Sequence, residues 1–186
     1  MKQLFFFSFL LTSWILSSQE HDCLAFKGKG ETYDKMRLDT RATLLFFFTD
    51  EKMKTYLKGK DLMTTHASLT YLENGFYILN LDLELAIANA LQLYGYIPVR
   101  GQIVFHFLDD SQVKLRINKK VEGIFDEKEK TYLYQLEYPL DANALKQLKV
   151  KELDELSITW SSGKETYEIY DVDVLIRQFR CLEKYQ

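Results

Sequence analysis

The chain has 186 residues, of which 47% are hydrophobic and 27% charged, so its composition excludes an intrinsically disordered protein and its length suits one domain. The formal net charge of -3 disfavours a nucleic-acid binder, because such proteins normally carry a basic surface. The 13 Phe, 12 Tyr and 2 Trp residues favour a sheet-rich fold, since aromatic side chains suit half-buried pleated surfaces.

Residues 1–18 have the pattern of a secretory signal peptide, with Lys2 ahead of the apolar run LFFFSFLLTSWIL and two serines behind it. We expect cleavage after Ser18 or Gln19, which leaves residues 19–186 as a single β-rich domain that is secreted or periplasmic. An uncleaved membrane anchor is disfavoured, because a transmembrane helix needs about 20 apolar residues and this run is shorter. After processing we therefore expect no transmembrane span.

The chain has two cysteines, Cys23 and Cys181, close to its two ends. Because exported chains meet an oxidising environment, we expect a disulfide between them that ties the first mature residues to the C-terminal element. Two free thiols, or a bond between two chains, are the alternatives. A lipid anchor on Cys23 is disfavoured, because the preceding residues are charged or polar where a lipidation signal needs small and apolar ones.

The first half of the chain predicts a buried strand, a short helix and a hairpin. The run RATLLFFF from Arg41 is short and apolar, and the following segment, residues 49–59, suits a helix that ends at Gly59. Asn74-Gly75 joins two β-prone runs and is a strong hairpin signal. The second run alternates, which predicts a sheet with one wet face. Its apolar set is Leu79, Leu81, Leu83 and Leu85, and its polar set is Asn80, Asp82 and Glu84. Residues 86–96 suit either a helix or a strand.

The second half predicts two more hairpins, a further strand and two helices. The hairpins join 102–108 to 112–118 and 156–160 to 165–170, and a strand at 131–138 ends at Pro139. Asp141 is a good N-cap for a helix over 140–153, and 171–182 has the apolar spacing of a terminal helix that carries Cys181. We therefore predict a mainly β (α+β) fold of six to eight strands. It is an antiparallel, hairpin-built sheet or β-sandwich with two or three short helices, one at the C-terminus.

The run from Gly101 to Ile117, with its FLDDSQVKL turn, and the run from Leu145 through ITWSSGKETYEIY to FRCL resemble a group of small bacterial proteins. These are uncharacterised, signal-peptide-bearing, β-rich proteins that are secreted or belong to the cell envelope. The resemblance covers the C-terminal half of the chain. It implies location and fold, and no activity.

Motifs of known catalytic chemistry do not occur in the sequence: there is no G-x-S-x-G, H-E-x-x-H or G-x-x-x-x-G-K-[ST] pattern. A hydrolase would have to assemble its site by folding, with His66 or His106 beside a carboxylate pair such as Asp82 and Glu84. A core histidine and solubilising surface carboxylates are the simpler interpretations. We expect no catalytic residues, no metal site and no cofactor.

Tyrosines are the residues that most suit binding, because each combines a flat apolar ring with a hydroxyl. The candidate set is Tyr132, Tyr134, Tyr138, Tyr167 and Tyr170. The alternative is that these rings pack in a sandwich core or at its rim. Our leading hypothesis is a non-catalytic, exported protein that binds a protein, glycan or apolar ligand at the cell envelope. Carriage of an apolar ligand between sheet and helices, and hydrolysis, are the rival hypotheses.

Overall fold

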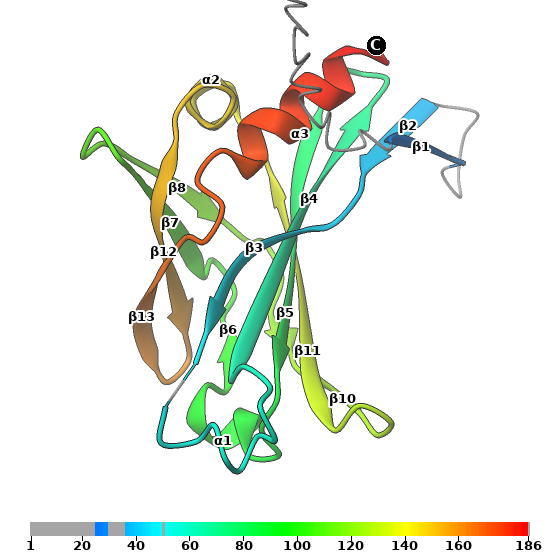
Figure 1. The fold of residues 1–186 in the computed structure, drawn as a ribbon. Helices are drawn as coiled ribbons and strands as arrows, with labels where there is room; N and C mark the ends of the chain where they lie inside the picture. Colours follow the sequence, from blue (N-terminus) through cyan, green and yellow to red (C-terminus); the bar gives the residue numbers. More distant parts are fainter. Residues whose placement is uncertain (1–24, 30–35, 50, 186) are drawn as a thin grey trace, which may run out of the picture.

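The protein is a β-sandwich closed at one end by helices (Figure 1). The computed structural model describes residues 25–29, 36–49 and 51–185. Its mainly β character, its antiparallel sheets and its C-terminal helix confirm the predicted fold class, and the described residues form one domain. The predicted signal peptide and Cys23 lie outside the described residues. No helix within the described part of the chain combines the length and apolarity that crossing a membrane requires.

The larger sheet has the order β1-β2-β4-β5-β11-β10, and β3 also pairs with β4. Its strands are β1 (Ala25–Lys29), β2 (Met36–Thr40), β3 (Thr43–Phe48), β4 (Met63–Leu72), β5 (Tyr77–Leu85), β10 (Ile124–Asp126) and β11 (Thr131–Pro139). The β4–β5 hairpin turns at Asn74-Gly75 as predicted, with Gly75 at a φ of 85°. The predicted alternation on β5 is also confirmed, because its leucines are buried and the polar residues between them are half-buried.

The smaller sheet has the order β13-β12-β7-β8 and faces the larger one. Its strands are β7 (Gln102–Phe107), β8 (Gln112–Arg116), β12 (Leu153–Trp160) and β13 (Gly163–Glu168). They form the two hairpins expected for the second half of the chain. A separate two-stranded ribbon, β6 (Tyr96–Ile97) with β9 (Val121–Glu122), lies near the lower end of the sandwich in Figure 1.

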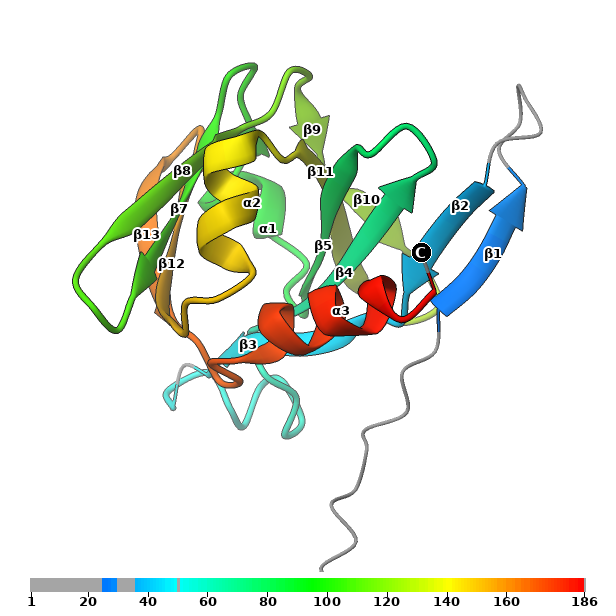
Figure 2. The ribbon, with the colours of Figure 1, turned by 90° about the horizontal axis from the view of Figure 1, so that it is seen from above.

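The core fills the space between the sheets, and two helices cover its upper end (Figure 2). The helix α2 (Ala142–Leu148) begins where predicted, because the Asp141 carboxylate accepts a hydrogen bond of 2.7 Å from the Ala144 amide. The helix α3 (Val174–Glu183) buries Phe179 and Leu182 against the core. The predicted helices at both places are confirmed, although α2 ends before residue 153.

A buried polar network fixes α3 to the larger sheet where β2 passes into β3. The chain leaves the sheet briefly there, so the backbone of β4 opposite the gap lacks strand partners. The Gln178 amide of α3 donates a 2.8 Å bond to the Ala67 carbonyl, and the Thr40 hydroxyl accepts a 2.8 Å bond from the Leu69 amide. Thr40 also donates to the Gln178 side-chain oxygen at 3.2 Å. Side chains thus satisfy backbone groups that the strand break leaves open.

Two segments needed the structure to settle them. The predicted helix over residues 49–59 is wrong: its described residues form successive turns that end in positive φ at Lys58 and Gly59. This segment buries one residue, Leu57, so it lacks the apolar face that stabilises a short helix. The open segment 86–96 contains one helical turn, α1 (Ala90–Leu93), and leads into β6.

Candidate functional site

The predicted tyrosine set does not form an open stripe. Tyr134, Tyr138 and Tyr167 are buried in the core, and Tyr132 is partly buried against it. The expectation that all five rings line one binding surface is therefore corrected, because alternation on β11 points its tyrosines at the opposite sheet. Tyr170, which follows β13, remains a surface residue with 65% of its area exposed.

Tyr134 and Tyr94 have packing roles against Trp160. The Tyr134 hydroxyl donates a 2.7 Å hydrogen bond to the Gly95 carbonyl, and its ring lies edge-on to Trp160 with 5.2 Å between centroids. Tyr94 contacts the same indole at 5.1 Å. Burial raises the pKa of Tyr134 to about 12 and raises the pKa of Tyr138 further. These hydroxyls stay neutral at physiological pH and are not poised for proton transfer.

The outer face of the larger sheet gathers polar side chains from strands that are distant in sequence. Strand register sets His66 of β4 opposite Asp82 of β5, and Asp82 opposite Gln135 of β11. Gln135 donates a 3.3 Å hydrogen bond to the Asp82 carboxylate. We call this surface the polar sheet face and define it by Thr64, His66, Ser68, Asn80, Asp82, Glu84, Gln135 and Glu137.

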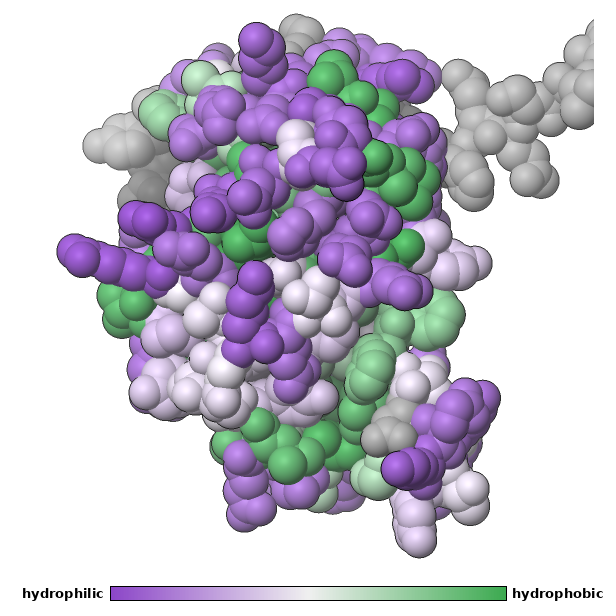
Figure 3. Space-filling model, turned by 90° about the vertical axis from the view of Figure 1, so that its left-hand side faces the viewer, coloured by the Kyte–Doolittle hydropathy of each residue, from purple (hydrophilic) through white to green (hydrophobic). Residues whose placement is uncertain are grey.

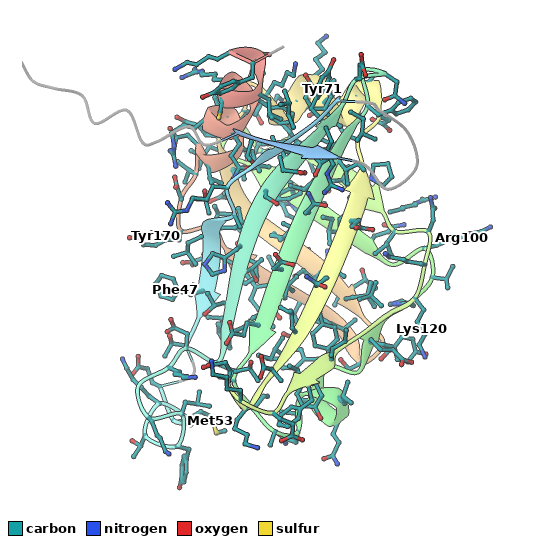
Figure 4. The ribbon with its side chains drawn as sticks, turned by 90° about the vertical axis from the view of Figure 1, so that its right-hand side faces the viewer. Phe47, Met53, Tyr71, Arg100, Lys120 and Tyr170 are labelled. Atoms are coloured by element: carbon teal, nitrogen blue, oxygen red, sulfur yellow. The ribbon has the colours of Figure 1, made fainter. Side chains whose placement is uncertain are left out.

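An exposed aromatic pair borders the polar sheet face at its β3 edge. The rings of Phe47 and Tyr170 have centroids 5.4 Å apart and are tilted by 53°, and Phe47 is 43% exposed. Figure 4 views this side of the molecule and shows both rings projecting from the same edge, whereas Arg100 and Lys120 lie at the opposite edge. Register places Phe47 beside Thr64, and Thr64 beside Glu84. The pair and the polar sheet face thus form one surface.

Charge on this surface is negative at its centre. Among the described residues, neither Asp82 nor Glu84 has a basic side chain within ion-pair distance. Glu137, at the rim, pairs with Lys119 at 2.9 Å. At Asp82 and Glu84 the polar sheet face therefore offers hydrogen-bond acceptors that form no ion pair with the described residues.

The other histidine considered for hydrolysis lies on the opposite side of the molecule. His106 is on β7 of the smaller sheet, and its Nε2 is 3.1 Å from the Ser157 Oγ. Ser157 also shares a 2.8 Å hydrogen bond with Thr166 and is only 1% exposed. A nucleophile must reach its substrate, so this pair has the geometry of a sheet cross-link and not of a catalytic dyad. Figure 3 shows this side of the molecule, where hydrophilic side chains are most abundant in the upper part and hydrophobic ones lie among them and toward the lower end.

Asp109 has a structural role. Asp109, at the tip of the β7–β8 hairpin, accepts hydrogen bonds from Lys151 and Ser111, which lower its pKa to about 2. No group of three or more His, Cys, Asp or Glu side chains within the described ranges could hold a metal ion.

A hollow of about 260 Å³ beside α1 is lined by Leu91, Gly95, Tyr96, Glu122 and Gly123. It opens to solvent, unlike the enclosed apolar cavity that a carrier needs.

No protein-family model matches this sequence, and neither curated proteins nor solved structures include a similar chain. The site therefore stands on its own geometry. Sequence reasoning grouped His66 with Asp82 and Glu84 only in the hydrolase hypothesis, and it did not connect Tyr170 with them. It missed Phe47, because the run TLLFFF gave no sign of which phenylalanine faces solvent.

Proposed function

We propose that this protein is an exported, non-catalytic binding protein of the cell envelope, and that it binds its ligand on the polar sheet face together with Phe47 and Tyr170. The observation that carries the proposal is the position of two contacting, solvent-exposed rings beside open hydrogen-bonding side chains. Large exposed aromatic residues that border polar groups are typical of recognition surfaces.

Export rests on the apolar leader and on the placement of the cysteines. The register of β1 sets Ala25 opposite Thr40, and Thr40 bonds to Gln178, one helical turn before Cys181. Cys23 is two residues before Ala25 in the sequence, so its bond to Cys181 is compatible with this arrangement. N-terminal sequencing of periplasmic protein, expressed from its own leader, should give a start at Gln19 or Glu20. A start at Met1 would remove the export proposal.

The binding proposal is tested by sedimentation with bacterial envelope preparations. The oxidised mature protein should sediment with the envelopes, and Phe47→Ala combined with Tyr170→Ala should reduce the bound fraction at least tenfold. The matched control combines Phe76→Ala and Tyr56→Ala, which remove a phenylalanine and a tyrosine that are more exposed than Phe47 and Tyr170 and are not part of the aromatic pair. Equal loss in both double variants, or no loss in either, would refute the assignment of the site.

A further inference from the structure

Resting on the proposed function, we infer that the ligand of the polar sheet face is an uncharged saccharide chain that stacks on the Phe47–Tyr170 pair and donates hydroxyl hydrogen bonds to Asp82 and Glu84. The inference starts from the chemistry of the surface. It combines one aromatic edge with a central region of carboxylate, amide, hydroxyl and imidazole groups. Sugars have the matching pattern, because a pyranose ring presents apolar C–H groups on its faces and hydroxyls around its edge.

The donor and acceptor balance favours hydroxyl donors. An ionised carboxylate only accepts hydrogen bonds and offers about four lone-pair sites. Gln135 occupies one side of Asp82, and no described side chain donates to Glu84. A ligand with several O–H donors can fill these sites without bringing a charge of its own.

Charge excludes one major class of saccharide. Asp82 and Glu84 lie on neighbouring outward positions of β5 with no cation of the described chain beside them. A uronic acid, sulfate or phosphate group placed there would meet like charge at short range, which is unfavourable even near a surface. Among saccharides, this leaves chains that carry no anionic group.

The shape and composition of the face disfavour a protein partner. Protein interfaces have a desolvated core enriched in aromatic and apolar residues and bury about 800 Å² on each side. Here the centre of the surface is polar, and the rings are confined to its edge. A peptide cannot extend the sheet from the centre of this face either, because the face presents side chains and β5 is paired with a strand on both sides. From β3 to β11 the surface spans three strand spacings, about 14 Å, which suits a short oligosaccharide.

The test is affinity electrophoresis of the oxidised mature protein in gels that contain one polymer each. The neutral probes are hydroxyethyl cellulose, xylan and mannan, with chitohexaose measured by calorimetry. The charged probes are polygalacturonate, heparin and poly-L-lysine. We expect retardation by at least one neutral probe, a loss of affinity of at least tenfold in Phe47→Ala/Tyr170→Ala, and unchanged affinity in the Phe76→Ala/Tyr56→Ala control.

A second pair of variants tests the role of the carboxylates. Asp82→Ala/Glu84→Ala should lower the affinity for the neutral probe at least tenfold. Asp82→Asn/Glu84→Gln keeps hydrogen-bond acceptors, so it should lower the affinity by less than half of that effect. These residues are partly solvent-exposed, so each variant should fold, and circular dichroism of each variant checks this.

The outcomes separate the inference from the proposed function. If no neutral probe binds, but envelope sedimentation or poly-L-lysine binding depends on Phe47 and Tyr170, the saccharide inference is overturned and the binding site stands. Binding of anionic polymers with equal affinity also overturns the inference. If neither envelopes nor any probe responds to the aromatic variants, both proposals fall together.

Discussion

Replacing Gln178 with methionine tests whether the polar network under α3 holds the fold together. The side chain is 6% exposed and makes three hydrogen bonds: its amide donates to the Ala67 carbonyl at 2.8 Å and to the Arg41 carbonyl at 3.4 Å, and its oxygen accepts from Thr40 at 3.2 Å. Methionine has a similar length and fills the same space without hydrogen bonds. Gln178→Met therefore leaves a buried carbonyl and a buried hydroxyl with fewer partners than they have now.

A buried polar group left without a partner costs about 1–3 kcal/mol, and the Thr40 hydroxyl keeps its bond from the Leu69 amide, so Gln178→Met should lower the free energy of unfolding by about 1–3 kcal/mol. That is a large part of the 5–15 kcal/mol typical of small domains. Urea unfolding of the oxidised protein, followed by tryptophan fluorescence, measures the change, and the slope with urea should stay constant.

The matched control is Gln147→Met on α2. Among the described residues, the Gln147 side-chain amide bonds only to Asn143 on the same helix, at 3.2 Å near the surface. Its replacement should therefore lower the free energy of unfolding by less than about 0.5 kcal/mol. If Gln178→Met is as mild as this control, the side-chain bonds are not what compensates for the strand break, and the reasoning fails.

Three further outcomes follow from the packing, the cysteines and one surface carboxylate. Tyr134→Phe should lower the free energy of unfolding by about 1 kcal/mol, because it removes the hydrogen bond to Gly95. Tyr138→Phe should leave the free energy of unfolding unchanged or raise it, since that hydroxyl has no partner among the described residues. The reverse order of stability in urea unfolding would contradict this. Alkylation of the unfolded, unreduced protein should label neither Cys23 nor Cys181, and Cys181→Ser should cost about 2–4 kcal/mol; labelling without reductant would exclude the disulfide. Because the folded pKa of Asp109 is about 2, below its ordinary value of 3.8, its contribution to stability is complete above about pH 5 and is lost as the pH falls through 3.8 toward 2. In Asp109→Asn the thermal melting temperature should therefore change less with pH over that range. An unchanged dependence of the melting temperature on pH would argue against the Lys151 contact.

Short-range pattern in the sequence was enough to determine the hairpins, the capped helix and the inward face of β5. Asn74-Gly75 specifies a tight turn locally, Asp141 caps the helix that follows it, and alternation of period two needs no knowledge of the partner strand. The amphipathic spacing of the last segment likewise sufficed for α3. These features depend on neighbours within a few residues, which the sequence contains.

Tertiary structure alone decided which residues form the candidate site. The run TLLFFF has no alternation, and a bulge between Leu44 and Phe46 shifts the register so that Phe46 is buried while Phe47 faces solvent. His66, Asp82 and Gln135 become neighbours only because three strands pair side by side. Whether a tyrosine packs or binds depends on what stands opposite it: the second sheet covers Tyr134, and nothing covers Tyr170 to the same extent. Pairing between distant strands, which has no local signature, is the physical reason that the site could not be predicted from the sequence.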